Sequence, residues 1–282
     1  MRTLRNKLVM AGLCVMSVCG LVSVVGAAEE AKQTLQLEGS TTVGPVGDAF
    51  AEAFMKSQGC SITVKKTGSG DGVAALIDGR CDIAMSSRFL KPEEFKKAVE
   101  NGVYPVAHTV AMDGVCVVLH PSNPINELTT AQIADIYMGK ITNWKDLGGP
   151  DMAIVAISRD TSSGTYEVFH EKVMNKKDMA ASVEYVNANP QAHARVKTTA
   201  GAIGYVGLGF LDRNVKAIKV DGVTPTKRTI AQGTFPVSRP LFLFTNGYPK
   251  LGSLIHAFCI FYLTEEGQEI VEAKGFVPMT NY

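Results

Sequence analysis

Three segments of the 282-residue chain share one pattern, in which a turn rich in glycine and hydroxyl residues joins a predicted strand to a predicted helix. The turns span residues 39–42, 67–72 and 159–165. The strands before them are predicted at residues 34–37, 62–66 and 154–157, from alternating or continuous apolar residues. Strands that feed helices through short turns build open sheets, so the pattern favours an α/β fold with a mainly parallel or mixed sheet flanked by helices.

The same turns have the chemistry to hold an anion. The first N–H groups of a helix have no partner inside the helix and lie at the positive end of its dipole. Glycine lets a ligand approach the backbone, and hydroxyls add further donors. Arg159 adds a guanidinium that can form two hydrogen bonds with a phosphate-like group. A cap at Thr161 or Ser162 would explain the third turn alone, whereas three such turns indicate helix N-termini that converge on one small anion.

The N-terminus has the layout of a secretory signal peptide over residues 1–27. Arg2, Arg5 and Lys7 precede an uncharged apolar run at residues 8–25, which ends in small residues. We therefore expect cleavage and a periplasmic or otherwise extracytoplasmic mature chain, with an uncleaved membrane anchor as the alternative. Loss of three basic residues changes the net charge from +1 to −2. Because no basic run is present, a nucleic-acid partner is not expected.

Four cysteines follow the signal segment. Cys60 and Cys81 each precede a predicted strand, so a disulfide between them is expected if those two strands are parallel neighbours. Cys116 and Cys259 lie in apolar segments and are expected to be buried thiols. The five histidines have no metal-ligand spacing with one another or with the cysteines, so neither a metal nor a cofactor is predicted.

The order of predicted elements suggests two lobes. Residues 34–112 and 240–282 would form the first lobe, and residues 113–239 the second. Apolar strands at residues 111–119 and 240–244 would connect them. Further helices are predicted at residues 92–101, 130–138, 166–174, 189–198, 251–263 and 265–274, and a loop at residues 141–150.

The chain resembles the phosphate-binding proteins of bacterial phosphate ABC transporters. The resemblance rests on the order and spacing of five segments, at residues 39–42, 67–70, 82–88, 141–145 and 159–165. It implies a two-lobed fold of the type II periplasmic-binding-protein class, with inorganic phosphate held in a cleft that closes by hinge motion. It also implies that the loaded protein delivers phosphate to the permease subunits of an ABC transporter, and a monomer is expected.

The resemblance also implies a set of phosphate contacts, and it leaves one role open. The implied contacts are Ser40, Thr41, Ser69, Ser87, Arg159, Ser163, Gly164 and Thr165. Some members have an aspartate where Ser87 stands; that carboxylate accepts the phosphate proton and repels sulfate. Asp71 and Asp160 are candidates for this acceptor role, Arg88 is expected to pair with an acid or with the anion, and Gly70 is a further possible contact.

Two alternatives remain at the level of the sequence. The same fold can bind another tetrahedral oxyanion, such as sulfate or molybdate. A secreted phosphoester or acyl-ester hydrolase would use Ser40 or Ser163 as its nucleophile. We do not expect an enzyme, because no histidine is near either serine in the sequence and Thr67 stands where a nucleophile elbow around Ser69 would need glycine.

Overall fold

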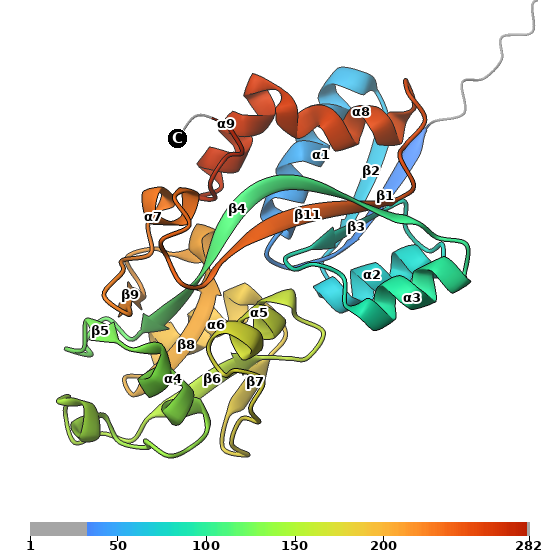
Figure 1. The fold of residues 1–282 in the computed structure, drawn as a ribbon. Coiled ribbons are helices and arrows are strands. Elements are labelled where there is room, and N and C mark those ends of the chain that lie inside the picture. Colours follow the sequence, from blue (N-terminus) through green and yellow to red (C-terminus); the bar gives the residue numbers. More distant parts are fainter. Residues whose placement is uncertain (1–32, 281–282) are drawn as a thin grey trace, which may run out of the picture. The chain divides into compact units, whose positions relative to one another are not determined.

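The computed structural model describes residues 33–280 (Figure 1). The predicted signal peptide at residues 1–27 therefore lies outside the described residues. The described chain contains a nine-stranded mixed sheet in the order β2-β1-β3-β11-β4-β8-β6-β7, with β9 paired to β4, and a small sheet of β10 and β5. The strands are β1 (Thr34–Gly39), β2 (Ser61–Lys65), β3 (Ile83–Ser86), β4 (Pro105–Leu119), β5 (Glu127–Leu128), β6 (Val155–Arg159), β7 (Glu184–Val186), β8 (Ala202–Gly207), β9 (Lys216–Ala217), β10 (Lys219–Val220) and β11 (Ser238–Asn246).

Helices alternate with these strands along most of the chain. The α-helices are α1 (Gly44–Gln58), α2 (Ser69–Ile77), α3 (Pro92–Glu100), α4 (Thr130–Tyr137), α5 (Gly164–Lys172), α6 (Asn189–Thr198), α7 (Lys227–Ala231), α8 (Leu254–Ile260) and α9 (Glu265–Ala273). Short 3-10 helices are η1 (Trp144–Leu147), η2 (Leu208–Phe210) and η3 (Phe261–Leu263). None of the helices within residues 33–280 is long and apolar enough to cross a membrane.

The first strands are parallel and share one edge at which their chains turn into helices. β1 pairs in parallel with β2 on one side and with β3 on the other. The carboxyl ends of the three strands therefore meet, and the turns that follow them lie together. This is the arrangement that brings the hydroxyl turns near residues 40, 69 and 87 to one place.

The same strand order overturns the predicted disulfide. Cys60 precedes β2 and Cys81 precedes β3, but β1 lies between these two strands, and both thiols are free and buried. Two strand spacings separate the cysteines by about 10 Å, well beyond the roughly 7 Å between Cα atoms that a disulfide can span. The prediction was wrong because it assumed that β2 and β3 are direct neighbours. Burial raises the pKa of Cys81 to about 12, as expected for an inert thiol.

Side chains on β11 alternate between two cores on opposite faces of the sheet. Leu241 and Leu243 pack with residues of α1, α8 and α9, whereas Phe242 and Phe244 pack with residues of α2 and α3. The helices lie accordingly, with α1 and α8 on one side of the first strands and α2 and α3 on the other (Figure 1). Because successive side chains of a strand point to opposite faces of the sheet, neighbouring residues of β11 contact different helices.

The long strands β4 and β11 join this part of the sheet to the rest. They pair antiparallel from Pro105 with Asn246 to Gly114 with Ser238, with one irregularity near Leu241. Beyond this pairing, β4 continues alongside β8, and a second core forms there around Trp144, which is fully buried. The loop predicted at residues 141–150 contains the 3-10 helix η1, which begins at Trp144. The Trp144 indole donates to the carbonyl oxygen of Gly201 at 2.9 Å and so anchors this loop to the core.

Most predicted elements are present with small shifts at their ends. The predicted helix at residues 189–198 matches α6, and the predicted strand at residues 111–119 extends back to Pro105 in β4. The α/β class with a mixed sheet is confirmed. The strand β8 was not predicted, although its six residues are all buried, because its two glycines weaken the apolar pattern of a strand.

Candidate anion-binding site

The first hydroxyl turn is fixed by a close backbone contact with β3. Gly39 has φ +134°, and a Cβ at this position would lie 2.2 Å from the Met85 carbonyl oxygen, so only glycine fits. The Ser40 amide donates to the same Met85 oxygen at 2.8 Å. The Ser40 hydroxyl accepts hydrogen bonds from the amides of Thr42 and Val43 at 3.1 and 3.2 Å. Because these amides occupy its oxygen, the hydroxyl has its own proton left to donate.

The second turn meets the end of β3. Gly68 has φ +133°, and α2 begins directly after it at Ser69. The Ser69 hydroxyl accepts a hydrogen bond from the Ser87 amide at 3.1 Å and lies 3.3 Å from the Ser87 hydroxyl. The Gly70 amide donates to the Ser162 carbonyl oxygen at 2.9 Å, which joins the second turn to the third.

The third turn is a capped helix start. β6 ends at Arg159 and α5 begins at Gly164. Ser163 caps the helix, since its hydroxyl accepts from the amides of Thr165 and Tyr166 at 3.2 and 3.3 Å. Like that of Ser40, the Ser163 hydroxyl therefore keeps its proton free for another acceptor. The helix cap is thus Ser163, not Thr161 or Ser162 as the alternative explanation of this turn had it, and Ser163 is also one of the expected phosphate contacts.

Gly164 sets how closely the third turn approaches the second. A Cβ at this position would lie 2.5 Å from the Ser69 hydroxyl oxygen and 2.7 Å from that of Ser87. Both distances are shorter than any carbon and oxygen atom tolerate without bonding. The absence of a side chain at Gly164 therefore leaves the space that these hydroxyls surround.

The three turns enclose a small cavity. The space is narrow, since the Thr42 and Thr165 hydroxyls that line it lie 3.0 Å apart and those of Ser69 and Ser87 lie 3.3 Å apart. Its lining consists of seven hydroxyl residues, two glycines and one arginine: Ser40, Thr41, Thr42, Gly68, Ser69, Ser87, Arg159, Ser163, Gly164 and Thr165. All eight contacts implied by the sequence resemblance are among these residues. Their side chains come from turns as far apart in sequence as residues 40 and 165, and the fold brings them together.

Arg159 is the charged group of this cavity, and it is almost fully buried. Its Nε donates to the Val186 carbonyl oxygen at 3.2 Å, and its Nη2 donates to the Asn187 carbonyl oxygen at 2.6 Å and to the Thr41 hydroxyl at 3.2 Å. Its Nη1 is buried without a hydrogen-bond partner among the described residues. Burial lowers the pKa of Arg159 to about 10, so the guanidinium remains charged at neutral pH. A buried charged donor without a partner is costly, and an anion in the cavity would satisfy it.

Two threonines connect the first turn to the third. The Thr42 and Thr165 hydroxyls lie 3.0 Å apart. The Asn189 side-chain amide, at the start of α6, donates to the hydroxyls of Thr41 and Thr42 at 3.3 and 2.9 Å. The Asn189 carbonyl in turn accepts from the Gly207 amide at 3.2 Å, so its orientation is fixed. The hydroxyl oxygens of Thr41 and Thr42 thus accept hydrogen bonds from N–H groups, so their own protons remain free to be donated to another acceptor.

The four further candidates do not line the cavity. The Gly70 amide is used by Ser162, and Asp71 is exposed on the first turn of α2. Arg88 forms a two-point ion pair with Glu94 at 2.8 and 2.7 Å, which answers the open question of its partner. Asp160 accepts from the amide and hydroxyl of Ser162 at 2.9 and 2.6 Å, as a turn-forming residue does. None of the ten lining residues is an aspartate or a glutamate.

Sequence reasoning missed a buried ion pair directly behind the cavity. Asp113 and Arg239 are 0% and 2% exposed, and the Arg239 Nη2 lies 2.7 Å from the Asp113 carboxylate. The available signals were the polar interruption at residues 113–114 of an apolar strand and an arginine just before another strand. Their pairing depends on the register of β4 with β11, which places Asp113 opposite Arg239. Asn189 was missed for the same reason, because only the tertiary fold brings it to the first turn.

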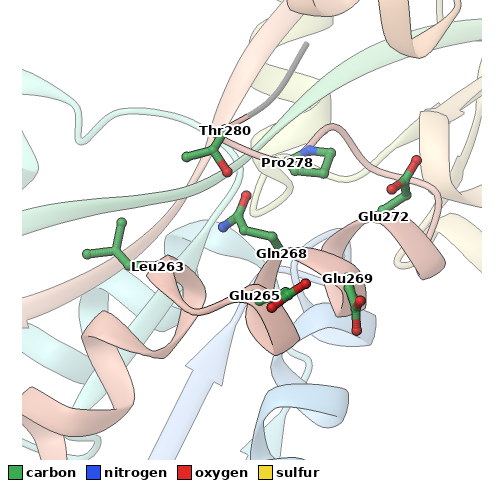
Figure 2. Close-up of a pocket in the computed structure, with 7 residues that line it drawn as sticks. All are labelled: Leu263, Glu265, Gln268, Glu269, Glu272, Pro278 and Thr280. Carbon is green, nitrogen blue, oxygen red and sulfur yellow. The ribbon is translucent and has the colours of Figure 1, made fainter.

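A larger surface hollow lies elsewhere, beside α9 (Figure 2). Its lining includes three acidic side chains, Glu265, Glu269 and Glu272. An acidic lining repels an anion, and the hollow contains none of the hydroxyl turns. The enclosed cavity between the turns is therefore the better candidate for the ligand site.

Comparison with known proteins shows the family of the chain. Residues 26–266 match the family described as PBP superfamily domain. The phosphate-binding protein PstS of Staphylococcus epidermidis is 34% identical over 265 residues, which cover 89% of this chain and 81% of that protein. The PstS of Borreliella burgdorferi is 30% identical, with 88% of this chain and 91% of that protein covered.

Solved structures give the same result. A structure from Clostridium perfringens, described as a phosphate ABC transporter substrate-binding protein with bound phosphate, matches with a TM-score of 0.81 and 35% identity, over 88% of this chain and all of that chain. An ABC-type phosphate transport receptor from Vibrio cholerae matches with a TM-score of 0.71 and 31% identity, over 86% of this chain and 99% of that chain. The α/β fold of the type II periplasmic-binding-protein class expected from the resemblance is thereby confirmed. The chain belongs to the PBP superfamily, among relatives that are named phosphate-binding proteins.

Proposed function

We propose that this protein captures inorganic phosphate in the cavity between the three turns and delivers it to the membrane subunits of an ABC transporter. The observation that carries the proposal is the buried Nη1 of Arg159, which has no partner among the described residues and belongs to a side chain that lines a cavity together with seven hydroxyl residues. Such a lining offers many hydrogen-bond donors and one uncompensated positive charge. A small tetrahedral oxyanion is the ligand that satisfies both.

Closure of two lobes around phosphate would complete the site. We assign residues 34–112 and 240–282 to one lobe and residues 113–239 to the other. Several contacts then cross between the lobes: Arg159 with Thr41 at 3.2 Å, Thr42 with Thr165 at 3.0 Å, and Lys91 with Glu167 at 2.5 Å. Contacts of this kind favour the closed form, and a bound dianion adds to them by bridging both sides. Occupancy and closure are therefore coupled, which lets a transporter distinguish loaded from empty protein.

The N-terminal sequence and the named relatives support a place of action outside the cytoplasm. Residues 1–27 would direct export and be removed, and the mature protein would act outside the cytoplasm as a monomer. No helix within residues 33–280 is suited to cross a membrane. The partner would be the permease of a phosphate transporter, since the similar proteins from Clostridium perfringens and Vibrio cholerae are described as a phosphate ABC transporter substrate-binding protein and an ABC-type phosphate transport receptor.

The hydrolase alternative has no support from the site. A serine nucleophile needs a base within hydrogen-bond reach. The ten lining residues include no histidine and no carboxylate, and the Ser40 and Ser163 hydroxyls face backbone amides instead.

Calorimetric titration of the mature, phosphate-stripped protein tests the proposal. We expect 1:1 binding of phosphate with a dissociation constant in or below the micromolar range. Sulfate and molybdate are titrated in the same way, and each is then added as a competitor. Binding of sulfate or molybdate without phosphate binding would keep the site and change the ligand. Absence of binding by all three anions would contradict the proposal.

A further inference from the structure

Asp113 on β4 and Arg239 on β11 form a buried pair next to the anion cavity. The two residues face each other in the register of these strands. Nε and Nη2 of Arg239 donate to the same Asp113 oxygen at 2.9 and 2.7 Å. The other Asp113 oxygen accepts from the Leu208 amide at 2.8 Å. Every part of the carboxylate is thus held, and the guanidinium has a fixed orientation.

The free edge of this guanidinium reaches two hydroxyls of the cavity. Nη1 of Arg239 lies 3.3 Å from the Ser87 hydroxyl oxygen, and Nη2 lies 3.5 Å from that of Thr42. A guanidinium only donates hydrogen bonds, so both hydroxyls act as acceptors toward Arg239. Thr42 also accepts from the Asn189 amide at 2.9 Å. With N–H groups donating to their oxygens, the Ser87 and Thr42 hydroxyls have their own protons left to donate, and their nearest hydroxyl neighbours are Ser69 at 3.3 Å and Thr165 at 3.0 Å.

The Ser87 and Thr42 hydroxyls both line the cavity. A bound anion offers the Ser87 proton a stronger acceptor than the Ser69 hydroxyl 3.3 Å away. The Thr42 oxygen already accepts from Asn189 and Arg239, which favours Thr42 as the donor to the Thr165 hydroxyl at 3.0 Å and leaves the Thr165 proton for the cavity. Ser40, Ser69 and Ser163 accept backbone amides in the same way. The lining then presents hydrogen-bond donors from every side.

We propose that Arg239, held by Asp113, is a positioning residue that fixes the hydroxyls of Ser87 and Thr42 as donors toward the bound oxyanion. This inference rests on the proposed function and adds a specificity rule to it. The site recognises oxygens that accept hydrogen bonds, and no carboxylate in the lining accepts a proton from the ligand. Each proton that phosphate gains therefore removes one favourable contact.

Asp113 gives the pair its net neutrality. Burial raises the pKa of the Asp113 carboxyl, and the adjacent Arg239 opposes this change. The pair therefore orients hydroxyls without adding a second net charge beside Arg159. Replacing both members by apolar residues of similar volume removes the orienting donors and leaves the net charge unchanged.

The test compares phosphate binding in three proteins at pH 8 and at pH 5, between which phosphate gains a second proton. They are the wild type, the pair variant Asp113→Leu with Arg239→Met, and Arg239→Lys, whose single ammonium cannot serve both hydroxyls. Lys140→Gln, which removes an exposed cation paired with Asp135, is the control. Melting temperatures are recorded for all of them.

We expect the pair variant and Arg239→Lys to bind phosphate about tenfold more weakly at pH 8. We also expect a smaller loss of affinity between pH 8 and pH 5 than in the wild type, because the released hydroxyls can accept the ligand's proton. Lys140→Gln should match the wild type in both respects. A role in stability alone would change the melting temperature and leave the pH profile as it is.

A second measurement tests whether Arg239 acts through the hydroxyls of Ser87 and Thr42. In a Ser87→Ala, Thr42→Val background, Arg239→Lys should cause no further loss, since the hydroxyls through which it acts are absent. An unchanged affinity and pH profile in Arg239→Lys, or a full additional loss in this background, would overturn the inference while leaving the phosphate site in place. Failure of the wild type to bind phosphate would overturn both.

Discussion

A single buried arginine explains why the cavity needs a ligand. Two nitrogens of Arg159, Nε and Nη2, donate hydrogen bonds to two backbone carbonyl oxygens and to the Thr41 hydroxyl. These bonds hold the side chain in place at the end of β6. The remaining nitrogen is buried without a hydrogen-bond partner among the described residues, and no acidic residue is among those that line the cavity with Arg159. The buried charge therefore destabilises the ligand-free protein, and a bound anion removes this destabilisation by pairing with the charge.

Substitution of Arg159 separates binding from stability. Arg159→Ala should weaken phosphate binding about 100-fold and Arg159→Lys roughly tenfold, because hydrogen bonds between charged groups contribute about 1.5–3 kcal/mol each. The melting temperature without phosphate should change little, because removal of an uncompensated buried charge offsets the loss of the hydrogen bonds that Arg159 donates to Val186, Asn187 and Thr41. Calorimetry and thermal unfolding measure the two effects. Unchanged phosphate affinity in Arg159→Ala would refute the assignment of the site.

At the scale of elements, the site depends on helices that start against each other. α2 begins at Ser69 and α5 at Gly164, and the Gly70 amide bonds to the carbonyl of Ser162 across the gap. A Cβ on Gly164 would fall between the hydroxyls of Ser69 and Ser87. The requirement at Gly164 is therefore one of space, unlike that at Gly39, where the backbone angle also excludes other residues.

Gly164→Ala tests this requirement for space. Alanine favours the helix, so α5 should persist, but the added methyl group enters the cavity and should weaken phosphate binding at least roughly tenfold. Gly70→Ala is the matched control, because its Cβ would meet its first neighbour only at 3.4 Å. Titration calorimetry on both variants gives the comparison. Equal affinity of Gly164→Ala and the wild type would mean that the ligand lies elsewhere.

The elements also show which parts of the site the sequence could predict. Each hydroxyl turn is a local pattern of strand, glycine and helix start, so residues such as Ser40, Ser69 and Ser163 could be identified without a structure. The pairing of Asp113 with Arg239 spans 126 positions and depends on the register of two strands. The predicted disulfide was wrong for a related reason, because strand order in a sheet is a long-range property. The hydroxyl turns could therefore be predicted from the sequence, whereas the residues that pair across neighbouring strands of the sheet could not.

At the scale of the whole molecule, the ligand would lie between segments that belong to both proposed lobes. Ser40, Ser69 and Ser87 come from the turns after β1, before α2 and after β3, whereas Arg159 and Ser163 come from the turn between β6 and α5. Within residues 33–280, β11 and β4 lie between β3 and β8 in the main sheet and join its two parts. A bound anion would therefore tie together two parts that the chain otherwise joins mainly through two strands.

Phosphate should accordingly stabilise the mature protein as one unit against heat. At a free phosphate concentration 1,000 times the dissociation constant, mass action adds about 4 kcal/mol to the free energy of unfolding. For a chain of this size each kcal/mol raises the melting temperature by about 2–4 °C, so an increase of roughly 8–16 °C in a single transition is expected. Differential scanning calorimetry measures it, with sodium chloride at equal ionic strength and Gly164→Ala as controls. An equal increase with chloride would show a salt effect, and two separate transitions with phosphate present would show that the anion does not join the two parts.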